Sequence, residues 1–259
     1  GLTAYLALDD AFMSIASRIH LIRKAKHSID LQYYIWNDDF IGHMMLHELL
    51  KAADRSVKIR LLLDDQNGTQ LDESLQALAT HPNFEIKLFN PYKYRKFRAI
   101  DYLFRLKHIN HRMHNKLIVA DGVIAVTGGR NISREYFDAS ESFQFTDLDI
   151  LFFGDAVKNA NQTVIQFWND DLSYSVQQWI GQGTKQQLER IRQHYLQDTQ
   201  SHNDLDDKLD FAQMQIQNHL EQRPIRWAKA HFISDIPDKI RGQSEEQKLI
   251  YNQMIKIMG

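Results

Sequence analysis

The chain has no cysteine among its 259 residues and no long apolar run. The first absence excludes disulfides, catalysis by a thiolate and zinc sites with cysteine ligands, although it leaves the cellular compartment open. No stretch reaches the ~18 consecutive apolar residues of a membrane-spanning helix, and no charged-then-apolar signal segment opens the chain. The hydrophobic content of 43% can furnish a buried core, so we expect a folded protein.

The chain also lacks a large excess of positive or negative charge, since its formal net charge is only −2. The charges are unevenly spread, however. Residues 93–116 contain eight Lys or Arg, three His and one acid, Asp101, with aromatic residues between them. This pattern predicts an anion nearby, and a solvated basic loop is the alternative.

Apolar runs and amphipathic segments alternate through the first two thirds of the chain. Runs typical of buried strands lie at 27–36, 57–64, 84–89 and 145–153, and segments with helical spacing lie at 11–26, 42–53, 71–80 and 155–169. This alternation predicts an α/β fold with a mixed, largely parallel sheet sandwiched by helices. Asp121-Gly122, between two further apolar runs, predicts a hairpin and hence an antiparallel part of the sheet.

The last third of the chain has a different character. From Leu172 onward it is rich in Gln, and its apolar residues have helical spacing. Thr184 is placed to cap a helix over the following residues, and residues 204–220 are a second helix candidate. We therefore predict an α/β domain at 1–171 and a mostly helical extension at 172–259.

Polar residues cluster around the predicted hairpin. His114 and Lys116 stand two residues apart, so on a strand they point to the same face and can meet one ligand. Behind the hairpin, Gly128 and Gly129 are expected to let backbone N–H groups and the Asn131 amide approach a phosphate.

Each of these residues also has an ordinary structural explanation. A lone histidine on a strand is usually a core residue, and Asn131 is suited to cap a helix that begins near Ser133. Tyr33 and Tyr34 fit a core strand, with the edge of the site as the alternative. The fixed combination of His, Lys, glycine pair and Asn nevertheless favours a phosphate-binding site.

These residues resemble a known motif. His114, Lys116 and Asp121, followed by GGRN, are similar to the HKD motif of the phospholipase D superfamily. The likeness covers most of residues 10–170 and is to the N-terminal half of two-motif bacterial enzymes of the cardiolipin synthase type. The segments that carry it are HSIDLQYYIWNDD, AADRSVKIRLLLDD, RMHNKLIVADG, GGRNISREYF and FTDLDIL. The resemblance makes 1–171 a phospholipase D-like half and 172–259 a linker toward a second half.

The resemblance also implies a mechanism. In that family one motif histidine attacks phosphorus to form a phosphohistidine, and the histidine of a second motif protonates the leaving alcohol. His114 takes one of these roles, and Lys116 and Asn131 hold non-bridging oxygens. A carboxylate behind the histidine fixes its tautomer, and the resemblance gives this role to Asp147, with Asp149 as the alternative.

Further residues complete the expected site. Asp121 is the acid of the motif, but its place beside the hairpin glycine favours a role in anchoring the turn. Lys107 and Arg112 of the basic segment, like the glycine pair, are expected to bind substrate. His108 and His111 have no carboxylates at ligand spacing, so we expect neither a metal nor another cofactor.

The sequence contains a single HxK, which departs from the two-motif pattern. The chain opens on Gly rather than Met, and we expect it to be a piece of a longer protein whose second HKD half lies beyond residue 259. Single-motif relatives pair two identical chains instead, so a homodimer is the alternative.

Three functions are compatible with these patterns. The first is a phosphatidyltransferase or phospholipase D that acts on anionic glycerophospholipids at a bacterial membrane as a peripheral enzyme, with a basic aromatic segment suited to that surface. A superfamily nuclease is the second, which the near-neutral net charge disfavours. The third is a fragment that binds anionic lipid without catalysis.

Overall fold

The computed structural model describes residues 1–259 with the exception of 9, 105–111, 137–146, 223–226, 235–236 and 238–259. Within these residues the strands form one nine-stranded mixed sheet in the order β8-β4-β3-β2-β5-β6-β7-β1-β9. The strands are β1 (Thr3–Leu8), β2 (Ser28–Tyr33), β3 (Lys58–Asp64), β4 (Phe84–Phe89), β5 (Lys116–Ala120), β6 (Ile124–Gly128), β7 (Asp149–Gly154), β8 (Ser173–Ser175) and β9 (Trp227–Ala228).

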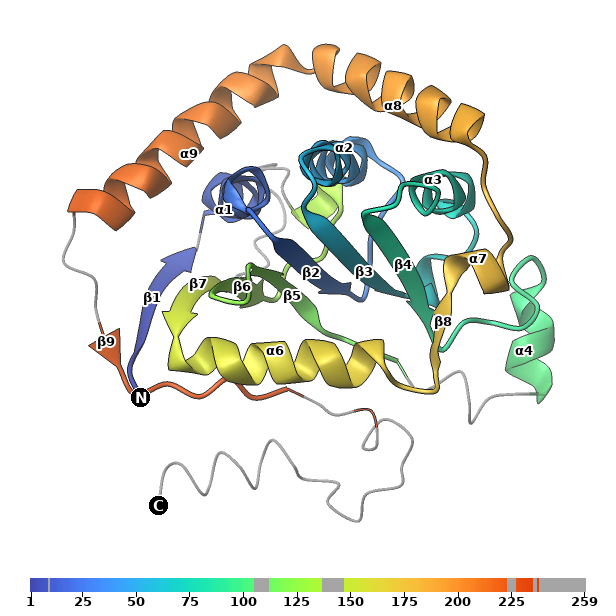
Figure 1. The fold of residues 1–259 in the computed structure, drawn as a ribbon, viewed down its shortest axis with the longest axis horizontal. Helices are drawn as coiled ribbons and strands as arrows, with labels where there is room; N and C mark the ends of the chain where they lie inside the picture. Colours follow the sequence, from blue (N-terminus) through green and yellow to red (C-terminus); the bar gives the residue numbers. More distant parts are fainter. Residues whose placement is uncertain (9, 105–111, 137–146, 223–226, 235–236, 238–259) are drawn as a thin grey trace.

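Helices cover both faces of this sheet (Figure 1). They are α1 (Ala11–Lys24), α2 (Phe40–Asp54), α3 (Asp72–Leu78), α4 (Arg98–Phe104), α6 (Asp155–Trp168), α7 (Val176–Trp179), α8 (Lys185–Gln200) and α9 (Asn203–Gln222), with short 3-10 turns η1 (Asp65–Asn67) and η2 (Arg134–Tyr136). Helices α1, α2 and α3 lie on one face and α6 on the other, while α8 and α9 arch over the first three as an outer layer (Figure 1). The α/β fold with a helical extension is thus confirmed.

The expectation of a largely parallel sheet was wrong. Among the described strands only β2 with β3 and β3 with β4 pair in parallel, and the other six pairings are antiparallel. Helices α2 and α3 provide the crossovers that those two parallel pairings need, whereas β5 and β6 are joined by the tight turn at Asp121-Gly122. Apolar content identified the strands but not their directions, because a buried antiparallel strand is as apolar as a parallel one.

Strand β5 shows how the sheet builds two cores. Its residues alternate, so Leu117 and Val119 pack against α6 beside Val157 and Val164. Ile118 points to the opposite face and joins the larger cluster under α1 and α2. Burial on both faces makes this a central strand and fixes its register, because a slip of one residue would exchange the two faces.

Helix α8 begins where the sequence predicts. Thr184 caps α8: its hydroxyl accepts from the Gln187 N–H, and the Gln187 side chain accepts in return from the Thr184 N–H. Just before it, β8 extends the sheet beside β4, so residues on both sides of position 171 contribute strands. The division at 171/172 stays a prediction. None of the described helices is both long and apolar enough to cross a lipid bilayer.

Candidate active site at the edge of the sheet

Several strand ends meet at one edge of the sheet. Strand β2 is parallel to β3 and β4 and antiparallel to β5, so the carboxyl ends of β2, β3, β4 and β6 lie beside the first residues of β5 and β7. Tyr33 pairs with Lys116 across β2 and β5, and Gly128 pairs with Asp149 across β6 and β7. Carboxyl ends of strands are where α/β folds usually bind ligands.

His114 and Lys116 open this edge. His114 is exposed just before β5, and Lys116 is the first residue of the strand. The Lys116 Nζ donates to the backbone carbonyl of His114 over 2.9 Å, which brings the ammonium close to the histidine. Burial lowers the pKa of Lys116, while the charges of Asp147 and Asp149 oppose the shift.

Tyr34 contributes the face of its ring to the same place. Its ring centroid is 4.3 Å from that of His114, and the Lys116 Nζ lies 5.6 Å from the Tyr34 centroid. Tyr33, by contrast, is fully buried, and its hydroxyl accepts from Arg18. The sequence left open whether these tyrosines belong to the core or to the edge of the site. In the structure Tyr33 lies in the core and Tyr34 lies at the site.

Asn131 ties two loops together above the sheet. Its side-chain Oδ1 accepts from the Ile35 N–H over 3.0 Å, and Trp36 and Ile132 form a parallel bridge next to it. The residue is buried. The sequence offered helix capping as another role for Asn131. In the structure Ser133 has this role, because its hydroxyl accepts from the Glu135 N–H in η2. Asn131 thus holds the loop after β2 against the loop after β6, at the same edge as His114.

The glycine pair is required by two carboxylates. A Cβ at Gly128 would overlap the carboxylate of Asp149, and one at Gly129 would lie 2.5 Å from the Asp147 Oδ1. The Gly129 N–H donates to the carbonyl of Leu148, so it is bonded within the protein. The sequence led us to expect glycine for close approach to phosphate, whereas in the structure it makes room for acids.

Asp149 lies in a buried charge network. Its carboxylate accepts from the Ser14 hydroxyl, pairs with Arg18 at 3.1 Å, and accepts from the backbone N–H of Arg130 at 3.3 Å. Burial alone would raise the pKa of Asp149, but Arg18, Ser14 and Arg130 outweigh it and hold the pKa below its ordinary value. These contacts keep the Asp149 carboxylate in the core. Asp147 is half-buried beside Gly129 and is the acid nearer the site.

Asp121 lies at the other end of the hairpin and anchors it. Its carboxylate accepts from the backbone N–H groups of Lys26, His27 and Ser28 at 2.7–3.2 Å. These bonds tie the turn to the start of β2, and the pKa of Asp121 lies below its ordinary value because they outweigh burial. This is the anchoring role that its place beside the turn predicted, and it keeps Asp121 at the opposite end of β5 from His114.

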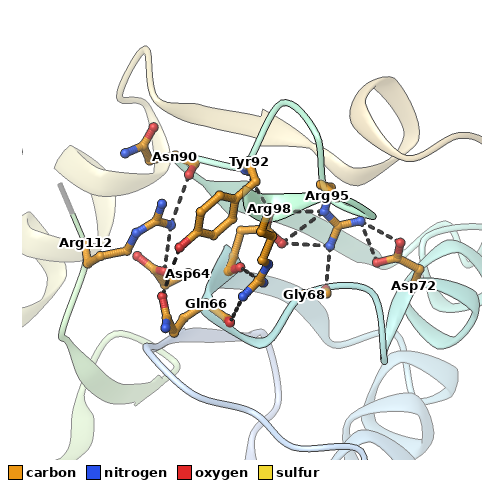
Figure 2. A network of polar contacts seen from close by, with 10 residues as sticks. Asp64, Gln66, Gly68, Asp72, Asn90, Tyr92, Arg95, Arg98 and Arg112 are labelled. Atoms are coloured by element: carbon orange, nitrogen blue, oxygen red, sulfur yellow. Dashed lines mark hydrogen bonds and ion pairs between the residues drawn. The ribbon is translucent and has the colours of Figure 1, made fainter. Parts of the chain in front are cut away.

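Arg112, which the sequence led us to expect at the substrate, points into the fold. It is buried, its Nη1 pairs with Asp64 at 3.0 Å, and its guanidinium lies 4.4 Å from the centroid of Tyr92 (Figure 2). Asp64 also accepts from the Met113 N–H at 2.8 Å, so it fixes the residues that precede His114. Sequence reasoning missed this role of Asp64, although its position at the end of a strand was visible. Lys107, His108 and His111 lie outside the described residues.

No group of three or more His, Asp or Glu side chains is arranged to hold a metal ion among the residues the structure describes. Among the described residues, this edge offers the exposed imidazole of His114, the ammonium of Lys116, the amide of Asn131 and the carboxylate of Asp147. Such a set can bind and attack a phosphodiester.

Comparison with known proteins identifies the family of the chain. The family model described as "Cardiolipin synthase, PLD-like domain" matches residues 18–165. Cardiolipin synthase C of Escherichia coli (strain K12) is 35% identical over 264 residues, which cover 100% of this chain and 55% of that protein. Cardiolipin synthase 2 of Staphylococcus epidermidis (strain ATCC 35984) is 31% identical over 64% of this chain and 33% of its own length. The chain thus spans about half the length of the first relative and a third of the second.

A solved structure supports the fold. Phosphatidylserine synthase from Haemophilus influenzae Rd KW20 superposes with a TM-score of 0.51 at 18% identity, covering 75% of this chain and 42% of that one. The family match begins within α1, ends within α6 and includes His114, Lys116 and Asn131. The chain belongs to the phospholipase D-like family of the cardiolipin synthase domain.

Proposed function

We propose that the chain supplies one half of a site for phosphodiester transfer on anionic glycerophospholipids. The observation that carries the proposal is the Lys116 ammonium bonded to the carbonyl of the exposed His114, at the carboxyl edge of the sheet. Two similar proteins are named cardiolipin synthases, which supports a phospholipid such as phosphatidylglycerol as the substrate. A lipid substrate in turn supports a peripheral site of action on a bacterial membrane.

The proposed reaction proceeds in two displacements. A histidine nitrogen attacks phosphorus, the bond from phosphorus to the leaving oxygen breaks, and a second histidine gives that oxygen its proton. Water or an alcohol then passes a proton to the second histidine and attacks phosphorus, which breaks the phosphorus–nitrogen bond. His114 is one of these two histidines. Lys116 and Asn131 stabilise the non-bridging oxygens, as metal ions do in other phosphoryl-transfer sites.

Asp147 is the proposed orienting acid for His114. Its carboxylate lies beside Gly129, and its charge acts on Lys116, whereas Asp149 is engaged with arginines. A carboxylate behind the imidazole keeps the proton on one nitrogen and leaves the other free to attack.

The second histidine comes from a second motif, because this sequence contains one HxK. We propose that it lies in another half of the same longer protein, with a second copy of this chain as the alternative source. The relatives' greater length supports the first source.

The test is turnover of phosphatidylglycerol vesicles by this chain and by His114→Ala, while light scattering reports the mass in solution. A monomer without turnover that gains activity when a second HKD half is added, but not when His114 is absent, supports the shared site. Turnover by a dimer that His114→Ala abolishes supports two copies of His114 in one site. Activity that survives His114→Ala contradicts the proposal, and cleavage of single-stranded DNA without lipid turnover would replace it by a nuclease.

A further inference from the structure

The segment of residues 93–103 follows β4 and includes most of α4. Its described apolar side chains lie on the outside. Phe97 is 70% exposed and Leu103 is 75% exposed, and Tyr94 and Ile100 are exposed as well. A helix on a water-soluble protein normally turns its apolar side to the core. This segment does the reverse, and it stands out from the body of the fold beyond the carboxyl ends of β3 and β4 (Figure 1).

Three charged residues of the segment point inward. Arg95 pairs with Asp65 at 2.7 Å and with Asp72 at 2.6 Å. Figure 2 shows Arg95 against Asp72. Arg98 donates to the backbone carbonyls at the start of η1, at 2.6 and 2.7 Å. Asp101 is fully buried and accepts from the Tyr94 N–H at 2.6 Å. These bonds hold the segment in one orientation, so its apolar side chains are fixed in their exposed positions.

The charges that remain outside are positive. Lys93 and Lys96 are exposed next to the apolar side chains, and the only acid of the segment, Asp101, is buried. The outer surface is therefore apolar and cationic with no exposed carboxylate in this stretch. Composition alone would place Arg95 and Arg98 of the basic run on the surface. Instead, Arg95 forms an internal ion pair and Arg98 donates to backbone carbonyls.

We propose that residues 93–103 form a docking segment that enters the surface of an anionic lipid bilayer. Phe97, Ile100 and Leu103 reach the boundary of the acyl chains, and Lys93 and Lys96 meet the phosphate groups. A protein partner fits less well, because lysine is depleted at the centre of protein–protein interfaces while apolar residues beside lysines are typical of membrane-surface elements. The inference rests on the proposed function for its choice of a lipid.

The docking segment is joined to the candidate site by a short chain of contacts. The guanidinium groups of Arg98 and Arg112 lie 4.4 Å from the Tyr92 centroid in each case, and Arg112 pairs with Asp64 (Figure 2). Asp64 in turn accepts from the N–H of Met113, the residue before His114. A bilayer bound at the docking segment is therefore held in a fixed relation to the histidine.

The first test measures binding of the whole chain to vesicles. We compare vesicles of phosphatidylglycerol and phosphatidylcholine with vesicles of phosphatidylcholine alone, by co-sedimentation. The double variant Phe97→Ser with Leu103→Ser is expected to lose more than tenfold in affinity for the anionic vesicles, because two apolar side chains no longer leave water. Unchanged affinity of this variant overturns the proposal.

The matched control uses an apolar pair of similar exposure elsewhere. Phe211 is 57% exposed and Met214 is 53% exposed on α9, at the far side of the molecule (Figure 1). Phe211→Ser with Met214→Ser is expected to bind vesicles as the parent chain does. An equal loss in both double variants would mean that exposed apolar residues bind lipid wherever they lie, and would overturn the assignment to the docking segment.

The second test locates the side chains directly. Because the chain has no cysteine, Phe97→Cys, Leu103→Cys and Phe211→Cys each accept a single environment-sensitive fluorophore. Anionic vesicles are expected to shift the emission to the blue at 97 and 103 but not at 211. A blue shift at 97 without vesicles, together with a doubled mass, would show that a second copy covers this face and would overturn the lipid proposal.

His114→Ala separates docking from chemistry. The substitution leaves the docking segment intact, so equal vesicle binding by this variant and the parent chain supports docking whatever the turnover assay gives. Loss of vesicle binding with His114→Ala would place the lipid contact at the histidine and overturn the docking segment. Failure of turnover even after a second HKD half is added, with binding through 97 and 103 preserved, contradicts only the proposed catalytic role.

Discussion

The ring of Tyr34 lies against the ring of His114, with centroids 4.3 Å apart and planes inclined by 33°. The contact follows from strand pairing, because Tyr33 is opposite Lys116 and Tyr34 is the next residue along. Tyr34 therefore limits the rotation of an exposed imidazole that has solvent on its outer side. We regard it as a positioning residue, which acts through His114.

Removal of the Tyr34 ring is expected to slow the reaction. Aromatic pairs contribute about 0.5–1.5 kcal/mol beyond their area, and ~1.4 kcal/mol corresponds to a tenfold change in rate. Tyr34→Ala should lower kcat on phosphatidylglycerol about tenfold in the active assembly and leave KM nearly unchanged. Tyr34→Phe should behave as the parent chain does. An equal loss in both variants would show that the hydroxyl, not the ring, supports the site.

The two glycines of the GGRN segment should respond differently to a methyl group. At Gly128 the new Cβ also meets backbone atoms of Leu148 and Asp149 at 2.6 Å, so Gly128→Ala should destabilise the fold by about 3 kcal/mol. At Gly129 the three nearest atoms all belong to the Asp147 side chain, which can move. Gly129→Ala should therefore keep its stability within about 1 kcal/mol and lose turnover. Urea unfolding measures the stability of both variants, and a turnover assay measures their activity. Full activity of Gly129→Ala would show that Asp147 has no role in the site.

The buried pair of Arg18 and Asp149 predicts strong coupling. Both side chains are fully buried, so the loss of Asp149 leaves Arg18 without its carboxylate, and the loss of Arg18 leaves Asp149 with Arg130 as its remaining ion-pair partner, at 3.4 Å. Asp149→Asn and Arg18→Met should each lower the free energy of unfolding at pH 7 by about 3–5 kcal/mol. The double variant should lose much less than the sum of the two. Additive losses would contradict the coupling.

The same pair has a pH dependence. The folded pKa of Asp149 lies below the ordinary value of 3.8, so the unfolded chain takes up protons first. The contribution of Asp149 to stability is therefore complete above pH 3.8 and is lost as the pH falls below it. The difference in unfolding free energy between the parent chain and Asp149→Asn should be constant from pH 5 to 8 and shrink in acid.

Local sequence patterns predicted many of the helices and strands. The apolar run at 84–89 coincides with β4, and Thr184 caps α8, because strand periodicity and helix caps depend on neighbouring residues. Strand directions could not be predicted in this way. Strand β1 pairs with β7 and β9, more than 140 residues away along the chain, and such pairing leaves no local trace.

The site was predicted in part for the same reason. A fixed spacing identified His114, Lys116 and Asn131, and the structure brings them to one edge of the sheet. Composition alone did not reveal that Arg112 turns inward, because Asp64, its partner, lies 48 residues away. Orientation of a long basic side chain depends on such distant partners, whereas a charge count treats every Lys and Arg as exposed.

Asp64 should make stability fall as the pH rises toward neutrality. Burial raises its pKa to about 7, although Arg112 and the Met113 N–H oppose the shift. Between pH 4 and 7 the folded chain thus holds a proton that the unfolded chain, with its ordinary pKa of 3.8, has released. Ionisation of the buried carboxyl then lowers the free energy of unfolding by up to about 1.4 kcal/mol for each pH unit. Asp64→Asn keeps an acceptor for Met113 but cannot titrate.

Urea unfolding of the parent chain and Asp64→Asn at pH 5, 6, 7 and 8 tests this sign. The parent chain should lose stability relative to the variant from pH 5 to 7, and the difference should level off at pH 8. Asp155→Asn is the control, because the pKa of Asp155 is about 2 and its carboxylate stays ionised throughout this range. If the advantage of the parent chain over Asp64→Asn is instead constant from pH 5 to 8, Asp64 is already ionised at pH 5. In that case Arg112 and Met113 offset the whole effect of burial, and the residues before His114 are held by a permanent ion pair.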